Sequence, residues 1–204
     1  MIAFAIKAAL ASNLFEHIIV STDNYEIANI AKQYNAEVPF MRPDNLSDDY
    51  TDTRSVISHG IDECENLGWD FNFVCCIYPC VPLIKTEDIR EGFNILNSSK
   101  DIFVFPIAEA NAKPQRSLGR RKSGDLFSIF PEFERSRTQD LTEGFFDAGQ
   151  FYWATKNKWL KSKNLFDGFL PFEINQSRFC DINNIEDWKS APVWTPEKIE
   201  KESR

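Results

Sequence analysis

The sequence predicts a three-layer α/β fold with a mostly parallel sheet between helices, and three observations lead to this fold class. Short apolar segments typical of strands alternate with amphipathic segments that have the apolar spacing of helices. The main strand segments are apolar throughout, which is typical of parallel strands buried on both faces. The chain has 204 residues, of which 43% are hydrophobic, so one domain with a substantial core is expected.

The expected elements follow one another along the chain. Helices are predicted at about residues 2–12, 24–33, 51–67 and 86–97, with a short one after 154 and a last one from about 185. Strands are predicted at residues 17–21, 37–40, 71–78, 102–106, 150–154 and 169–175. Residues 108–148 lack this rhythm and are rich in loops. We expect residues 1–191 to form one domain and residues 192–204 to form a charged tail.

Two helix starts carry a predicted cap. Asp23 and Glu26 have capping-box spacing, so Asp23 is expected to cap the helix at 24–33 rather than to contact a ligand. Thr86 is expected to cap the helix at 86–97 in the same way.

The composition excludes several classes of function. A formal charge of −8 argues against a general nucleic-acid binder, whose affinity comes from neutralised phosphates. No apolar run approaches the ~20 residues that cross a bilayer, and the first residues lack the features of a signal peptide. The five cysteines have no Cys-x-x-Cys spacing. We therefore expect free thiols, no zinc site and a cytoplasmic protein.

Polar side chains follow the predicted strands, at the edge where such sheets carry their sites. Pro43 keeps Arg42 out of the helical region. The guanidinium of Arg42 then either points into a cleft, where its planar fork suits phosphate, or forms a surface pair with Asp44 or Asp48. Tyr78 ends the most apolar strand and opens a loop with two prolines. This loop is either a rigid site for a base edge or a plain turn before the next helix.

Further candidates lie in the second half of the chain. Lys113–Arg116 and Ser136–Asp140 gather positive charge in an acidic protein, which either steers an anionic substrate or forms a solvated loop. Residues 147–152 combine a carboxylate, a flexible glycine and an amide before an aromatic strand, where core packing explains Phe151 better than a ligand does. Asp181 follows an apolar strand and could hold Mg²⁺ through oxygen.

These motifs together resemble a known family, the nonulosonic acid cytidylyltransferases, which include the CMP-sialic acid synthetases. The resemblance covers about residues 2–190, and its pseudaminic acid branch is the most similar. It is carried by Ser21-Thr22-Asp23, Arg42-Pro43 with Leu46-Ser47-Asp48-Asp49, Gln115-Arg116, Gln139-Asp140, the run Asp147-Ala148-Gly149-Gln150-Phe151-Tyr152-Trp153, and Asp181-Ile182 through Asp187-Trp188.

The resemblance implies a Rossmann-like nucleotidyltransferase that couples CTP to a nine-carbon sugar acid and releases pyrophosphate. It implies Arg42 and Asp181 as catalytic residues and Arg42, Ser47 and Tyr78 at the nucleotide. Asp181 and Asn183 would hold Mg²⁺. The sugar acid would contact Gln115, Arg116, Gln139, Gln150, Phe151 and Tyr152. The resemblance also implies a homodimer, formed through residues 108–148, and one cleft in which Arg42, Arg116 and Asp181 converge.

The sequence departs from this family at two places. Asn183 stands where the family has a second carboxylate, so we expect weaker metal binding. The chain opens in a helix, without the strand and glycine-rich loop that hold the phosphates in the family. Without that strand, two neighbouring strands would keep unpaired backbone groups, and we expect inefficient turnover of CTP. Alternatives are a CMP-N-acetylneuraminate or legionaminate synthetase, a binding module without catalysis, and a purely structural domain.

Overall fold

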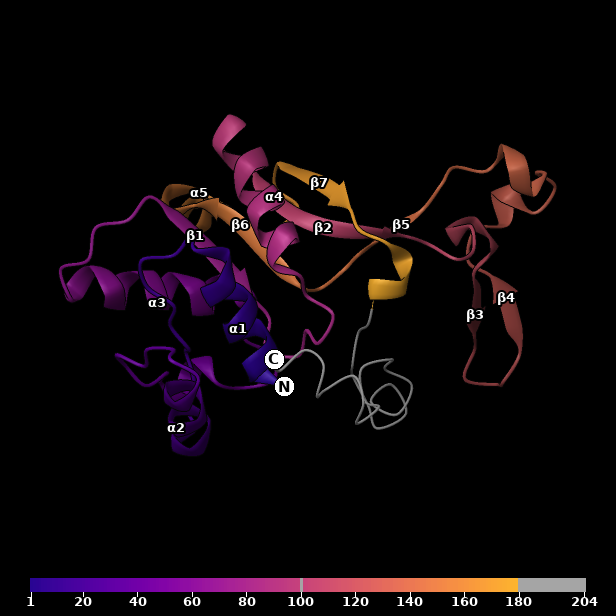
Figure 1. The fold of residues 1–204 in the computed structure, drawn as a ribbon. Coiled ribbons are helices and arrows are strands. Elements are labelled where there is room, and N and C mark those ends of the chain that lie inside the picture. The colour runs from indigo at the N-terminus through magenta and orange to yellow at the C-terminus, as the bar shows by residue number, and fades with distance from the viewer. Residues whose placement is uncertain (100, 180–204) are drawn as a thin grey trace, which may run out of the picture.

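The computed structural model describes residues 1–99 and 101–179, and Figure 1 shows their arrangement. The helices are α1 (Ile2–Ser12), α2 (Tyr25–Gln33), α3 (Thr53–Asn66), α4 (Thr86–Ser98) and α5 (Lys156–Lys161). The strands are β1 (Phe73–Ile77), β2 (Phe103–Glu109), β3 (Leu118–Arg120), β4 (Leu126–Ser128), β5 (Phe145–Asp147), β6 (Phe151–Thr155) and β7 (Phe169–Glu173). The predicted helix from residue 185 lies outside the described residues.

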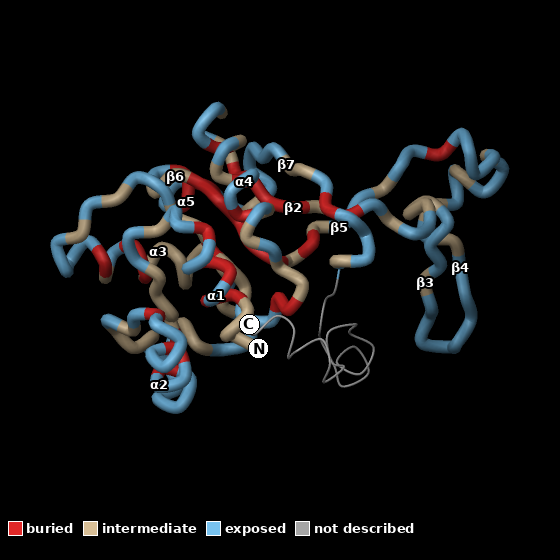
Figure 2. The backbone as a smooth tube through the Cα atoms, viewed as in Figure 1, coloured by how far each residue is buried: buried red, intermediate tan, exposed pale blue. Residues whose placement is uncertain are grey.

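Three layers form the body of the molecule, as the α/β pattern predicts. On one face of the sheet, Ile61 of α3 and Trp159 of α5 pack with Tyr152 and Phe105. On the other face, helices α1 and α4 pack on Phe151 and Trp153. These two groups alternate along β6 because successive side chains of a strand point to opposite faces. The central strands are therefore buried on both sides (Figure 2).

The sheet is less parallel than the sequence predicts. Its order is β1-β6-β2-β5, and β7 pairs with β2. β7 runs parallel to β2, whereas β6 is antiparallel to both β1 and β2, and β5 is antiparallel to β2. The prediction of a mostly parallel sheet is thus wrong for the described strands. A parallel neighbour needs a crossover over one face of the sheet, but the chain that leaves β2 runs out through residues 110–144 and comes back to the sheet as β5 and β6, in the opposite direction.

The two strands predicted at 17–21 and 37–40 are reduced to one parallel bridge between Ile19 and Glu37. The N–H of Val20 donates to the carbonyl of Glu37 over 2.9 Å, and the N–H of Glu37 donates to Ile18 over 2.8 Å. Among the described residues, β1 pairs with β6 alone and has no ladder to this bridge. The bridge and the five-stranded sheet are therefore separate in hydrogen bonding.

Residues 110–144 form an arm that extends away from the sheet, as Figure 1 shows. The arm holds the two-stranded hairpin β3–β4 and three single-turn 3-10 helices, η2 (Pro114–Arg116), η3 (Pro131–Phe133) and η4 (Thr138–Asp140). Most of its residues are exposed (Figure 2). Within residues 1–99 and 101–179, no helix has both the length and the apolar character that a bilayer span requires.

Candidate functional site

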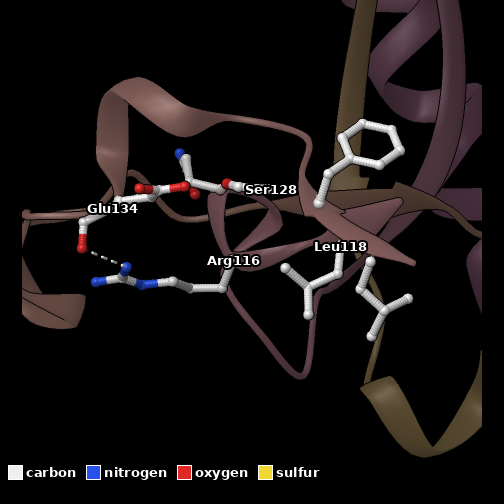
Figure 3. A pocket seen from close by; sticks show the side chains of 7 residues that line it. Arg116, Leu118, Ser128 and Glu134 are labelled. Carbon is white, nitrogen blue, oxygen red and sulfur yellow. Dashed lines mark hydrogen bonds between the residues drawn. The ribbon is translucent and has the colours of Figure 1, made fainter. Parts of the chain in front are cut away.

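Three of the predicted substrate residues lie on the arm. Gln115 and Arg116 line a shallow pocket with Glu134 and residues of the β3–β4 hairpin (Figure 3). The guanidinium of Arg116 donates to the carbonyls of Phe133, Glu134 and Ser136, at 3.4 and 3.3 Å for the first two. Arg116 therefore ties η2 to the segment after η3. Gln139 is exposed on η4.

A second pocket opens where the arm leaves the sheet. Lys113, Arg116 and Gln176 supply its polar side, and Phe146 and Phe179 supply an apolar wall. The rings of Phe146 and Phe179 stack with their centroids 5.8 Å apart. This pocket therefore combines cationic and apolar groups.

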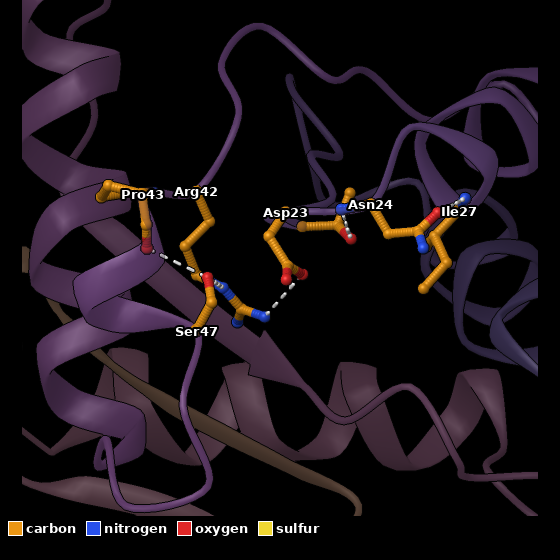
Figure 4. A network of polar contacts seen from close by, with 7 residues as sticks. Asp23, Asn24, Ile27, Arg42, Pro43 and Ser47 are labelled. Atoms are coloured by element: carbon orange, nitrogen blue, oxygen red, sulfur yellow. Dashed lines mark hydrogen bonds and ion pairs between the residues drawn. The ribbon is translucent and has the colours of Figure 1, made fainter.

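Arg42 is held at the end of the bridge segment (Figure 4). Its N–H donates to the carbonyl of Thr22 over 2.9 Å. Its Nε donates to the hydroxyl of Ser47 over 3.2 Å, and its guanidinium lies 3.6 Å from a carboxylate oxygen of Asp23. Arg42 and Ser47, two of the residues that the resemblance implies at the nucleotide, are thus in contact. The carboxylate beside Arg42 is Asp23, whereas the sequence suggested Asp44 or Asp48.

Both predicted helix caps are wrong by one residue. The side chain of Asn24, not Asp23, caps α2 and accepts from the N–H groups of Glu26 and Ile27 at 2.8 and 3.1 Å. A cap can bind either the second or the third N–H of its helix, so spacing alone does not separate neighbouring candidates. The N-cap of α4 is Lys85, which makes no side-chain cap bond. The carboxylate of Asp23 is consequently available to Arg42.

A cluster of hydroxyl groups lies between β1, β6 and α3. The hydroxyl of Tyr152 donates to Oδ2 of Asp147 over 2.7 Å. The hydroxyls of Tyr78 and Thr53 are 2.9 Å apart. The ring centroids of Tyr78 and Tyr152 are separated by 5.4 Å. Burial raises the pKa of Tyr78, and burial together with the charge of Asp147 raises the pKa of Tyr152, so both hydroxyls stay protonated at neutral pH.

Gln150, Phe151 and Tyr152 lie deeper than a substrate wall requires. They have exposed fractions of 3%, 0% and 3%. Gln150 donates through Nε2 to the carbonyl of Arg178 over 3.1 Å, while its Oε1 is buried without a partner among the described residues. Phe151 packs against α4, as the core-packing alternative expected. Of these three residues, only Gln150 has a buried polar atom without a hydrogen-bond partner among the described residues.

The predicted convergence of Arg42 and Arg116 does not occur within this chain. Arg42 lies between α2 and α3, whereas Arg116 precedes β3 on the arm, and Figure 1 shows these elements at opposite ends of the molecule. Both pockets described above are lined by Arg116, and neither is lined by Arg42. The prediction of a single cleft is thus wrong for one chain. The sequence could not reveal this because the arm's direction depends on how β2 and β5 leave the sheet.

The predicted metal ligands Asp181 and Asn183 lie outside the described residues. Among residues 1–99 and 101–179, no three His, Cys, Asp or Glu side chains gather as a metal site would require. Three residues of the polar clusters have no predicted role. Asp147 belongs to a predicted motif but has no role of its own there, and the ion pair between Asp88 and Arg178, which joins α4 to η5 (Gln176–Arg178), has no signal in the sequence. Asp147 carried one signal, its position two residues before Gly149.

Comparison with known proteins identifies relatives along most of the chain. Residues 1–160 match the sequence profile of a family described as cytidylyltransferase. A pseudaminic acid cytidylyltransferase of Campylobacter jejuni is 29% identical over 95% of this chain and 84% of its own length. A CMP-N,N'-diacetyllegionaminic acid synthase of Legionella pneumophila is 30% identical over 92% of this chain and 82% of its own.

A solved structure supports the same fold. A CMP:2-keto-3-deoxy-manno-octonic acid synthetase superimposes with a TM-score of 0.61 over 85% of this chain and 78% of its own, at 10% sequence identity. At that identity, the likeness establishes the fold alone.

Proposed function

Because the chain belongs to the cytidylyltransferase family, a family of nucleotidyltransferase enzymes, we propose that it transfers the CMP group of CTP to a nonulosonic acid, with pseudaminic acid as the substrate. The observation that carries this proposal is the match to pseudaminic acid cytidylyltransferase along 95% of the chain. The geometry supports it through Arg42, which the bridge segment and Ser47 hold in a fixed orientation.

The proposed reaction is an in-line displacement at the α-phosphorus of CTP. The anomeric oxygen of the sugar acid forms a bond to the α-phosphorus, the bond from that phosphorus to the bridging oxygen breaks, and pyrophosphate leaves. The proton of the anomeric hydroxyl is released to solvent. Arg42 would bind phosphate oxygens, for which a guanidinium is suited. The pairing with Asp23 is partly exposed and long at 3.6 Å, so phosphate could displace it.

The donor set predicted for Mg²⁺ fits a hard cation by its chemistry. Asp181 offers a carboxylate and Asn183 an amide oxygen, both of which Mg²⁺ accepts. When bound, the ion would offset negative charge on the phosphates. Because Asn183 is uncharged, we expect a higher Mg²⁺ requirement than with two carboxylates.

We further propose that two chains form one working unit. The arm separates Arg116 from Arg42 in one chain, and a second copy could bring its arm to the Arg42 side of the first. Exposed apolar side chains on the arm and on β5 at its base support this: Leu118, Leu126, Phe127, Ile129, Phe145 and Phe146 are 39–61% exposed. Light scattering at micromolar concentration tests the dimer, and a monomer would overturn it.

The cytoplasmic location stays a proposal that the cysteines support. The four cysteines of the described part of the chain, Cys64, Cys75, Cys76 and Cys80, are all free thiols. Free thiols fit a reducing compartment such as the cytoplasm.

A pyrophosphate-release assay with CTP, Mg²⁺ and three acids tests the function. We expect release with pseudaminic acid and slower release with N,N'-diacetyllegionaminic and N-acetylneuraminic acids. If N,N'-diacetyllegionaminic acid gives faster release than pseudaminic acid, the legionaminate synthetase alternative is favoured. The Legionella relative is the observation behind this alternative. A saturable CTP isotherm without any release would instead identify a binding module.

Arg42→Ala tests the role of the guanidinium in the same assay. Loss of a charged hydrogen bond to phosphate should lower kcat/KM about 10- to 100-fold. Lys32→Ala serves as the control because it removes one positive charge from the exposed side of α2. Equal rates for both variants would contradict the assignment of Arg42.

A further inference from the structure

We propose that Asp147 is a positioning residue for nucleotide binding, which acts through Tyr152 and Tyr78 on the loop that follows β1. The proposal rests on the proposed function, since that loop is the segment expected to meet the nucleotide. Asp147 itself touches no substrate in this scheme. It begins a series of contacts, two hydrogen bonds joined by one contact between rings, that runs from the base of the arm to the start of α3.

Asp147 is anchored by both carboxylate oxygens. Oδ2 accepts from the hydroxyl of Tyr152 at 2.7 Å, and Oδ1 accepts from the N–H of Gly149 at 2.9 Å. Gly149 has φ 61°, a left-handed conformation that glycine adopts readily. In the sheet, Asp147 stands opposite Ile107 of β2, at the point where β5 gives way to the turn before β6. The carboxylate therefore fixes both the turn and the tyrosine that follows it.

Tyr152 links the Asp147 turn to β1. It stands opposite Cys76 in the β1–β6 ladder, and the N–H of Tyr78 donates to the carbonyl of Gln150 over 2.9 Å. The rings of Tyr152 and Tyr78 are neighbours, with centroids 5.4 Å apart. The hydroxyl of Tyr78 then meets Thr53, the first residue of α3, at 2.9 Å. Four side chains thus join β5, β6, the end of β1 and the start of α3.

Packing alone does not account for these residues. Phenylalanine at position 152 would fill the same space without a buried hydroxyl that needs a partner. Instead Tyr152, 3% exposed, places its hydroxyl on a carboxylate that is itself partly buried. A charge-assisted bond of this kind is shorter and more directional than a neutral one, and so it restricts orientation. The element that gains this restriction is the loop after Tyr78.

Calorimetric titration of CTP into the full chain measures the effect without requiring turnover. Asp147→Asn and Tyr152→Phe should each raise the Kd for CTP about tenfold, the order expected for one charged hydrogen bond. The double variant should raise it no further than either single variant, because both break the same chain of contacts. Glu65→Gln is the matched control, since it breaks the 2.7 Å ion pair with Lys156 at the other end of β6.

Each outcome decides the proposal. A purely structural role predicts lower melting temperatures with an unchanged Kd, or additive effects of the two substitutions, and either result would overturn it. If Asp147→Asn does not fold, Tyr152→Phe and Tyr78→Phe keep both rings, and an unchanged Kd in both would overturn it as well. Wild-type protein that binds CTP but releases no pyrophosphate refutes the proposed function and leaves this inference standing. Wild-type protein that does not bind CTP refutes both.

Discussion

Replacing Gly92 with alanine would place a Cβ 2.9 Å from Cδ1 of Trp153 and 3.0 Å from Cε2 of Phe151. Both rings belong to the core and are 2% and 0% exposed, so neither can swing into solvent. Overpacking of this kind costs about 1–3 kcal/mol. The gain from replacing glycine by alanine inside a helix offsets about 0.5–1 kcal/mol of this. We therefore expect a net loss of about 1 kcal/mol in the free energy of unfolding, with an upper limit of about 2.5 kcal/mol.

Thermal unfolding followed by circular dichroism measures this loss. For a domain of about this size, each kcal/mol lowers Tm by roughly 2–4 °C, so Gly92→Ala should melt roughly 2–4 °C lower, and at most about 10 °C lower. Gly60→Ala is the matched control, because its Cβ would meet only Cζ of Phe40 at an ordinary 3.7 Å. This control should melt at or above the wild-type temperature. If Gly92→Ala melts as high as Gly60→Ala, the close packing of α4 on β6 is refuted.

Two further predictions concern α3 and the loop after β1. Hydrogen bonds from the hydroxyl and N–H of Ser55 hold the pKa of Asp52, the N-cap of α3, below its ordinary value. The cap therefore stabilises the fold fully at a pH above the ordinary pKa of aspartate. This stabilisation is lost as the pH falls through the lowered pKa of the folded state. Asp52→Ala should lower the free energy of unfolding by about 1 kcal/mol at neutral pH and leave it unchanged in strong acid. Urea unfolding measures this, with Asp62→Ala as the control. A loss of stability that grows in acid would contradict the prediction. Cys80 is exposed, whereas burial raises the pKa of Cys76 to about 12. Iodoacetamide should therefore label Cys80 before Cys76, as measured by peptide mass spectrometry, and equal rates would contradict the burial of Cys76. CTP should slow the labelling of Cys80, and an unchanged rate would contradict the assignment of this loop to the nucleotide.

The order of helices and strands was accessible from local patterns. α1 spans the predicted residues and ends where Asn13 adopts a left-handed conformation at φ 55°. The apolar segment around Cys75 and Cys76 forms β1 as predicted, because a run of buried β-forming residues has few other solutions. The caps at Asp23 and Thr86 were wrong because several polar residues stand at each helix start, and the one that caps depends on the approach of the preceding chain.

The candidate site was accessible only in part. Arg42 and Ser47 meet because they are five residues apart in one constrained loop. Tyr78 and Tyr152 meet because β1 and β6 are neighbours, and that pairing is not visible in either segment alone. The link from Asp147 to Tyr152 depends on the left-handed turn at Gly149.

Periodicity, turn chemistry and motif order fix the α/β class and the cytidylyltransferase family from the string of residues, because these signals act over a few neighbouring positions. The direction of β6, the path of the arm and the distance between Arg42 and Arg116 belong to the tertiary structure. They follow from strand pairings between segments far apart in the chain. Such pairings depend on the combined burial of both faces of the sheet, which no single segment encodes.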